Sequence, residues 1–323
     1  MKFDRWYALI IITFLIWGTQ HPCLKLLSDE LPPLLINLVR FSMTLLVLIP
    51  FVAVQKMMPS KKDLLKMAGL GVLGIALYGF LVVSGLRRST SINGSILLNT
   101  HPLVAAIVAP YLVKETFHIR GILGIATGFV GMMLVILQGL SFQSVLETRY
   151  LGGNLLLFLA AICLALYAVC SKFLVPRYGS LVTTFYAVLA GTVILFAVAG
   201  ASGELSQWNS IAPKHLLLLA YVAIMTTALT WVMWFKAIQK LGVFKAEPFF
   251  FLLPISGMIS ARIFLGEHIS GISIVGIFCI LTGIYMVQKE VRLRKQDTRN
   301  AGKNQNKQEI MLMSGSHQFQ ERS

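Results

Sequence analysis

The segment PLVAAIVAPYLVKE, residues 102–115, has a counterpart in PISGMISARIFLGE, residues 254–267. In both segments a proline lies thirteen residues before a glutamate, and the two copies are 152 positions apart. The same offset aligns Gly124 with Gly276 and Gly131 with Gly283. Leucine and alanine matches arise easily in apolar sequence, so the proline, glutamate and glycine matches carry the argument. They indicate that the chain consists of two related halves.

The composition is that of a membrane protein. Charged residues make up 13% of the 323 positions, whereas soluble domains have about a quarter. Apolar stretches of about twenty residues recur, the length needed to cross roughly 30 Å of hydrocarbon. Because every backbone amide must be hydrogen-bonded in lipid, and alternating strand patterns are lacking, we expect helices. The predicted spans are residues 6–27, 33–54, 64–86, 91–113, 119–138, 151–173, 181–200, 214–236, 243–264 and 269–288.

The number of spans in each half determines the predicted topology. Each half has five, and because five is odd, two copies joined in series enter the membrane in opposite directions. Equivalent loops then face opposite sides: the 55–66 connection carries four lysines, whereas the 200–214 connection carries Lys214 and Glu204. The predicted fold class is an all-α membrane protein of ten transmembrane helices, arranged as inverted five-helix repeats at residues 6–138 and 151–288.

The net charge of +15 is explained by orientation rather than by nucleic-acid binding. Most of the 28 lysines and arginines lie in the loops on one side of the predicted topology and in the tail. Positive residues concentrate on the cytoplasmic side, so both termini are expected there, in a multi-pass protein of the cell (plasma or inner) membrane. Residues 289–323 are polar and rich in Asn and Gln, which predicts a disordered basic cytoplasmic tail.

The sequence lacks the motifs of catalysis, ATP hydrolysis and metal binding. We find no Walker motif, no H-E-x-x-H and no nucleophile elbow, so neither an enzyme nor an ATP-driven pump is expected. The four cysteines lie within predicted spans without C-x-x-C spacing, so neither disulfides, nor a metal site, nor another cofactor is predicted.

Together these features resemble the EamA-type branch of the drug/metabolite transporter superfamily, over roughly residues 6–288. The resemblance depends on Trp17-Gly18, Arg40-Phe41, the two Pro…Glu segments and the two glycine pairs. It implies a ten-helix secondary transporter with a central cavity between its halves, often an exporter of small metabolites. It does not specify the substrate.

Polar and aromatic side chains inside the spans identify candidate cavity residues, because polar groups at that depth face protein or water rather than lipid. Asn37 and Arg40 share one face of the second span; Arg40 could clamp a carboxylate or anchor the helix structurally. Glu247 is either a proton or cation site or part of an interfacial cluster with Lys245. The candidates for substrate binding are Gln20, His21, Asn37, Arg40, Asn99, His101, Tyr167, Trp231, Trp234 and Glu247.

Four further residues are predicted to have structural or gating roles. Pro102 and Pro254 interrupt the hydrogen bonding of their helices, and would act either as bends that flex around the cavity or as fixed kinks. Glu115 and Glu267 precede helices whose first turn favours negative charge. We expect them to cap those helices, with proton transfer as the alternative.

The predicted function is secondary transport of a small organic metabolite, amino-acid-like or otherwise anionic or zwitterionic, by alternating access and in the export direction. The alternatives are a passive facilitator or channel, a multidrug efflux protein, and a lipid-translocating carrier of the same superfamily. The expected partners are a small-molecule substrate, membrane lipids and, as a candidate coupling ion, the proton. No nucleic acid is expected, and a homodimer is left open.

Overall fold

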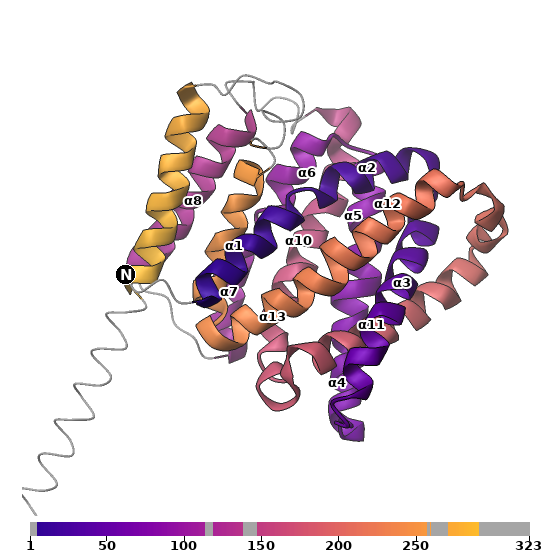
Figure 1. Cartoon of the computed structure of the whole chain (residues 1–323). Coiled ribbons are helices and arrows are strands. Elements are labelled where there is room, and N and C mark those ends of the chain that lie inside the picture. The colour runs from indigo at the N-terminus through magenta and orange to yellow at the C-terminus, as the bar shows by residue number, and fades with distance from the viewer. Residues whose placement is uncertain (1–4, 114–118, 138–146, 257–258, 260–270, 291–323) are drawn as a thin grey trace, which may run out of the picture.

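The computed structural model describes residues 5–113, 119–137, 147–256, 259 and 271–290, and the regular structure in these ranges is entirely helical (Figure 1). Within them, nine helical segments are long and apolar enough to cross a membrane. They are Arg5–Glu30, Pro33–Ala53, Lys61–Arg87, Asn93–Leu112, Ile119–Leu137, Thr148–Ser171, Val175–Ala201, Pro213–Leu241 and Gly271–Glu290. The prediction of an all-helical membrane protein is therefore confirmed.

The nine segments fall on nine of the ten predicted spans, and the span predicted at 243–264 is described only in part. It begins with α14 (Val243–Ala246), continues as the 3-10 helix η5 (Glu247–Leu252), and its described apolar helix ends at Ser256. Glu115, Glu267 and the tail beyond Glu290 lie outside the described residues.

Two of the spans are broken near their middle. The first consists of α1 (Arg5–Trp17) and α2 (Gln20–Glu30), and the fourth of α6 (Ser91–Leu98) and α7 (His101–Val113). At the first break Gly18 lies against the Glu247–Ser256 helix, where an added Cβ would come within 1.7 Å of the Ser256 hydroxyl. The break therefore requires glycine for close approach of the first and ninth spans.

The third and eighth spans contain matching π-helical segments. The third is built from α4 (Lys61–Gly71), the π-helix η1 (Val72–Leu77) and α5 (Tyr78–Arg87). The eighth is built from α12 (Pro213–Ala223), the π-helix η4 (Ile224–Leu229) and α13 (Thr230–Leu241). The two π-helices are 152 residues apart, which is the offset of the sequence repeat. A rare backbone feature is thus repeated at the same place in each half.

The two halves pack against each other through equivalent elements. The first span of one half packs on the third span of the other: α1 contacts α13, and α10 (Leu151–Ser171) contacts α5. In the same way α3 (Pro33–Ala53) contacts η4, and α11 (Val175–Ala201) contacts η1. The short 3-10 helices η2 (Thr148–Tyr150) and η3 (Glu204–Ser210) precede α10 and α12.

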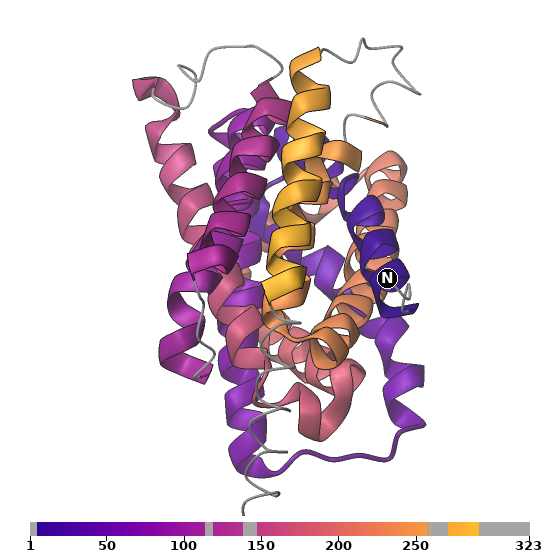
Figure 2. The ribbon, with the colours of Figure 1, turned by 90° about the vertical axis from the view of Figure 1, so that its left-hand side faces the viewer.

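The helix α8 (Ile119–Leu137) and the Gly271–Glu290 helix lie side by side in Figures 1 and 2, and their backbones are in direct contact at four glycines. A Cβ added at Gly131 would lie 2.5 Å from the Gly276 carbonyl oxygen, and one at Gly283 would lie 2.5 Å from that of Gly124. The order of these contacts makes the two helices antiparallel. Exchanging each glycine for its repeat equivalent converts one contact into the other.

Ion pairs also join the halves, one of them between α4 and α11 and another between α12 and α2. Asp63, at the start of α4, pairs with Arg177 at the start of α11 (2.8 Å). His215, at the start of α12, lies 2.8 Å from Glu30 at the end of α2. Asp63 and His215 are again 152 positions apart, so equivalent helix starts carry an acidic residue in one half and a basic residue in the other.

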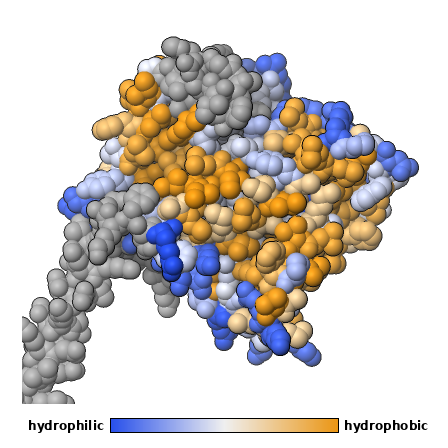
Figure 3. All heavy atoms as spheres, in the orientation of Figure 1, coloured by the Kyte–Doolittle hydropathy of each residue, from blue (hydrophilic) through white to orange (hydrophobic). Residues whose placement is uncertain are grey.

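The outer surface suits a lipid environment. Figure 3 shows apolar residues over much of the described face, with hydrophilic residues gathered toward its edges. Large apolar side chains such as Leu46, Phe278 and Leu217 are more than two-thirds exposed. A contiguous surface of this kind is stable where lipid, rather than water, covers it.

Replacing Gly276 with alanine is expected to destabilise the protein, although alanine favours helices over glycine by up to about 1 kcal/mol. The added Cβ would lie 2.6 Å from the Gly131 carbonyl oxygen, which belongs to the backbone and cannot rotate away. We expect a loss of about 1–3 kcal/mol, measured by denaturant unfolding in detergent micelles. Gly69→Ala is the matched control, because no atom lies within 4 Å of its added Cβ. Equal stabilities of the two variants would contradict the tight contact.

Candidate functional site

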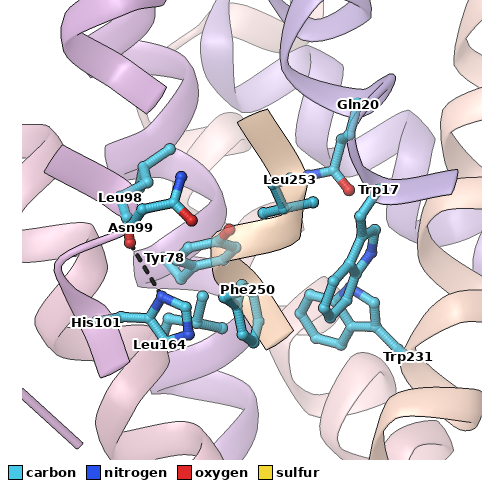
Figure 4. Close-up of a pocket in the computed structure, with 10 residues that line it drawn as sticks. All are labelled: Trp17, Gln20, Tyr78, Leu98, Asn99, His101, Leu164, Trp231, Phe250 and Leu253. Atoms are coloured by element: carbon cyan, nitrogen blue, oxygen red, sulfur yellow. Dashed lines mark hydrogen bonds between the residues drawn. The ribbon is translucent and has the colours of Figure 1, made fainter. Parts of the chain in front are cut away.

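A cavity lies between the two halves, close to the breaks in the first and fourth spans (Figure 4). Its lining residues are Trp17, Gln20, Tyr78, Leu98, Asn99, His101, Leu164, Trp231, Phe250 and Leu253. The free space for the centres of water-sized spheres is about 30 Å³. One water needs about 10–15 Å³ on this measure, so the cavity has room for two or three waters and none for a metabolite. We refer to this arrangement as the closed form.

The fourth span breaks because Pro102 has no backbone N–H. In a regular helix that group would donate to the carbonyl of Leu98, four residues earlier. The ring of His101 replaces it: Nδ1 lies 3.0 Å from the Leu98 oxygen, as the dashed line in Figure 4 marks. Since a carbonyl oxygen can only accept, Nδ1 carries the proton and donates. The proline thus determines both the orientation and the tautomer of the histidine.

Two more side chains complete this repair of the backbone. Asn99 Nδ2 donates to the Ser95 carbonyl oxygen (2.7 Å), and Thr100 Oγ1 donates to that of Leu97 (2.6 Å). The carbonyl oxygen of the Asn99 side chain is buried and has no hydrogen-bond partner among the described residues. The side-chain oxygen of Gln20 is likewise buried without a hydrogen-bond partner among these residues. The cavity wall therefore offers two unused hydrogen-bonding groups.

His101 meets Glu247 across the interface between the halves. Its Nε2 lies 2.8 Å from Glu247 Oε2, and the two side chains are 1% and 4% exposed. The carboxylate lies at ion-pair distance but out of line with a ring N–H, and neither of its oxygens has an aligned hydrogen bond among the described residues. Phe250 covers the histidine edge-on, with ring centroids 3.8 Å apart. Glu247 is thus buried against a histidine from the other half of the chain.

Aromatic rings form one side of the cavity. Trp17 packs against Phe250 (5.3 Å between centroids) and against Trp234 (5.5 Å), and Trp231 packs against Tyr167 (5.4 Å). Trp17, Trp231 and Phe250 line the free space, whereas Trp234 and Tyr167 are fully buried behind them. Trp234 and Tyr167 therefore support the wall from behind.

Trp17 also links the first span to the π-helix of the eighth. Its Nε1 donates to the Thr226 carbonyl oxygen at 2.8 Å, and Thr226 lies within η4. Thr44 on α3 makes a second bond to this part of the eighth span, donating to the carbonyl oxygen of Ala223, just before η4 (3.1 Å).

Comparison with known proteins identifies the family. The sequence profile of the EamA-like transporter family matches residues 4–137 and, a second time, residues 151–288. The chain belongs to the EamA-like transporter family. The resemblance stated from the sequence is thereby confirmed, and the family indicates a multi-pass membrane transporter rather than an enzyme.

Relatives of this EamA-like transporter agree with that assignment. The uncharacterized transporter YyaM of Bacillus subtilis is 28% identical over 239 residues, covering 74% of this chain and 78% of its own. A probable amino-acid metabolite efflux pump of Salmonella typhimurium is 23% identical over 300 residues, covering 90% and 97%. A solved crystal structure matches with a TM-score of 0.67 at 17% identity, covering 88% and 97%, and shows that the fold is shared.

Two candidates of this EamA-like transporter lie away from the cavity. Asn37 Nδ2 donates to the carbonyl oxygens of Pro33 (2.8 Å) and Gly79 (3.0 Å), and so joins α3 to α5. Arg40, 1% exposed, donates from Nε to Thr227 Oγ1 at 2.8 Å. Its Nη2 has no partner among the described residues, and no ion pair with a described carboxylate satisfies it.

The structure thus brings together part of the predicted site. Gln20, Asn99, His101 and Trp231 line the cavity, and Glu247 adjoins it through His101. The side chain of His21 lies outside the described residues. The aliphatic lining residues were not predicted from the sequence. One of them, Leu253, could have been found, because it is the repeat equivalent of His101. Tyr78 and Leu164 gave no sequence signal that separates them from ordinary core residues.

Trp17→Phe is expected to cost about 1–3 kcal/mol of unfolding free energy, because it removes the buried hydrogen bond from Trp17 Nε1 to the Thr226 carbonyl oxygen. Trp6→Phe is the matched control, since Trp6 is partly exposed and its ring lies near Arg5, Lys236 and Lys240 instead. Denaturant unfolding in detergent measures both. A Trp17→Phe variant as stable as Trp6→Phe would show that the bond to η4 contributes nothing.

Proposed function

We propose that this EamA-like transporter is a secondary transporter that exports a small organic metabolite by alternating access between two inverted five-helix halves, residues 6–138 and 151–288. One observation carries the proposal: a closed cavity, with unused polar groups, whose walls come from both halves. A cavity built in this way opens when the halves move relative to each other, and it can open toward either side of the membrane.

The inverted arrangement is supported by contacts between equivalent elements. The Gly124–Gly283 and Gly131–Gly276 contacts are exchanged when each residue is replaced by its repeat equivalent, and the helices that carry them are antiparallel. A two-fold axis perpendicular to both helices produces this pattern. Because these helices are long enough to span the membrane, such an axis lies in the membrane plane. Both termini would then be cytoplasmic, in the cell membrane, as the charge distribution predicts.

The chemistry of the walls supports an amino-acid-like solute. Trp17, Trp231 and Phe250 offer an apolar face, and Gln20 and Asn99 offer amide groups that can accept from an ammonium or donate to a carboxylate. Such sites are mostly apolar with a few placed polar groups. The Salmonella relative, whose name refers to amino-acid metabolites, supports the same class of substrate.

Arg40 is proposed to hold the carboxylate of the substrate in an open form. Its guanidinium lies over the ring of Phe41 (4.8 Å), which packs against Trp231 of the cavity wall (6.3 Å between centroids), and one of its nitrogens is without a hydrogen-bond partner among the described residues. A charge so deep in the membrane is costly, and a bound anion would offset that cost. The guanidinium can bind a carboxylate through two parallel hydrogen bonds.

The inverted topology is tested by cysteine labelling at Ser60 and Gln207, in a chain whose four native cysteines are replaced. We expect a membrane-impermeant maleimide, applied to intact cells, to label Gln207→Cys only. Ser60→Cys should be labelled after the membrane is permeabilised, and serves as the positive control for reagent access. Labelling of both positions from the same side would exclude inverted halves.

Transport is tested with the full chain in vesicles, using a panel of labelled amino acids as probes. Wild type should move at least one of them, and Arg40→Ala should raise its KM about tenfold or more, as loss of a hydrogen bond to a charged group predicts. Arg149→Ala, which removes an exposed arginine, is the control. A KM and rate unchanged by Arg40→Ala would overturn the carboxylate clamp, and movement without accumulation against a gradient would indicate a passive facilitator. Thermal unfolding of each variant separates loss of binding from loss of folding.

A further inference from the structure

The His101–Glu247 pair is a buried titratable pair that the fold alone does not require. In the repeat, Ser95 is the equivalent of Glu247, and Leu253 is the equivalent of His101. The other half therefore has a serine and a leucine where this pair would be duplicated. Contacts that hold the scaffold together, such as the glycine contacts, occur on both sides of the repeat relation. The pair occurs on one side, so the repeated part of the scaffold does not require it.

The burial and spacing of the pair indicate how many protons it holds. His101 Nδ1 is committed as a donor to the Leu98 carbonyl, so a neutral ring has no proton on Nε2. An ionised Glu247 beside that neutral ring would be a buried charge with no aligned hydrogen bond and no counter-charge among the described residues, which is costly. One further proton is therefore expected on the pair, either on Nε2 as an imidazolium beside a carboxylate or on Glu247 as a carboxylic acid beside a neutral ring. In both cases the pair as a unit holds one proton.

We propose that His101 and Glu247 form a proton-binding site, and that transport is coupled to the proton gradient through it. The coupling role rests on the proposed function; the proton-binding role does not. In the closed form loss of this proton is unfavourable, because it would leave a buried carboxylate beside a neutral imidazole without a counter-charge.

Opening of the cavity supplies the route for the proton. His101 belongs to the fourth span and lines the cavity, and Glu247 belongs to the ninth, so separating these spans breaks the pair and admits water to it. On one side of the membrane the shared proton passes to water and leaves a neutral imidazole and a carboxylate. The halves then return through the closed form without the proton, and the ammonium group of the bound amino-acid-like substrate meets the carboxylate charge in its place. On the other side the substrate leaves and a proton from water restores the pair. One proton therefore crosses in one direction for each substrate that crosses in the other.

Among the described residues, the other titratable groups on the helices around the pair are mostly tyrosines, or cations at the surface. On α1, Tyr7 donates to Gln288 (3.0 Å). On α10, Tyr167 is buried against Trp231, and its hydroxyl has no hydrogen-bond partner in the described part of the chain. Tyr111 on α7 and Arg120 on α8 are exposed.

Lys245, two residues before Glu247 on α14, is partly exposed, and its backbone carbonyl accepts from Gln288. Glu290, at the end of the last described helix, is buried. Within the described residues, a buried histidine meets a buried carboxylate at the His101–Glu247 pair.

The proton-binding site is tested without any substrate, using full-length protein in lipid nanodiscs with ¹⁵N-labelled histidine. The chain has six histidines, and the His101 signal is identified by its loss in His101→Gln. We expect a protonated Nδ1, and an Nε2 signal that moves when Glu247→Gln is introduced. Glu30→Gln is the matched control, since it removes the carboxylate of the His215 pair instead. An Nε2 signal that titrates like an exposed imidazole and ignores Glu247→Gln would overturn the site.

Coupling is tested in vesicles with the labelled amino acids as probes and a pH-sensitive dye inside. Wild type should accumulate its probe under an imposed pH gradient, and a protonophore should abolish the accumulation. Glu247→Gln should retain exchange of probe across the membrane and lose at least tenfold of the accumulation, whereas Glu30→Gln should behave as wild type. Accumulation by Glu247→Gln equal to that of wild type would overturn the coupling. If wild type moves no probe at all, the proposed function fails, and the histidine signals alone decide whether the proton site exists.

Discussion

Hydrogen bonding of the backbone in an apolar environment is the constraint on which this structure depends. In lipid, a carbonyl without a donor costs several kcal/mol, so each departure from regular helix must be repaired by a side chain. The break at Pro102 is repaired by His101, Asn99 and Thr100. The π-helix η4 is repaired by Trp17 and Thr44. Several of these repairing side chains also line the cavity, because helices are irregular where the two halves meet. Structural need and the candidate site therefore share the same residues.

This sharing explains which parts could be predicted from the sequence. Span length and hydropathy identified nine membrane helices, because a span must be about twenty apolar residues long whatever its neighbours. The repeat offset aligned the glycines that the structure brings into contact, and the two π-helices, which were not predicted, obey the same offset. Gln20, Asn99 and His101 were predicted as cavity residues because a polar side chain deep in a span faces protein or water rather than lipid, and all three line the cavity.

What failed to be predicted depends on contacts between distant segments. The sequence placed Glu247 beside Lys245 because only neighbours along the chain are visible there, whereas its partner is 146 positions away. Asn37 and Arg40 share a helix face, as predicted, but periodicity does not say which neighbour that face meets, and it meets α5 and η4 rather than the cavity. Tyr78 and Leu164 became lining residues only through the packing of both halves.

The crossing of α8 and the Gly271–Glu290 helix has a mechanical consequence. Four glycines bring the two backbones into direct contact there, and side chains such as Val135 and Val287 pack against the glycines of the facing helix. Small residues permit this close approach in membrane helices. Because one helix comes from each half and no flexible side chain separates the two backbones at these glycines, the crossing sets a minimum distance between the halves. Any larger residue at these four positions would act as a spacer and push the halves apart.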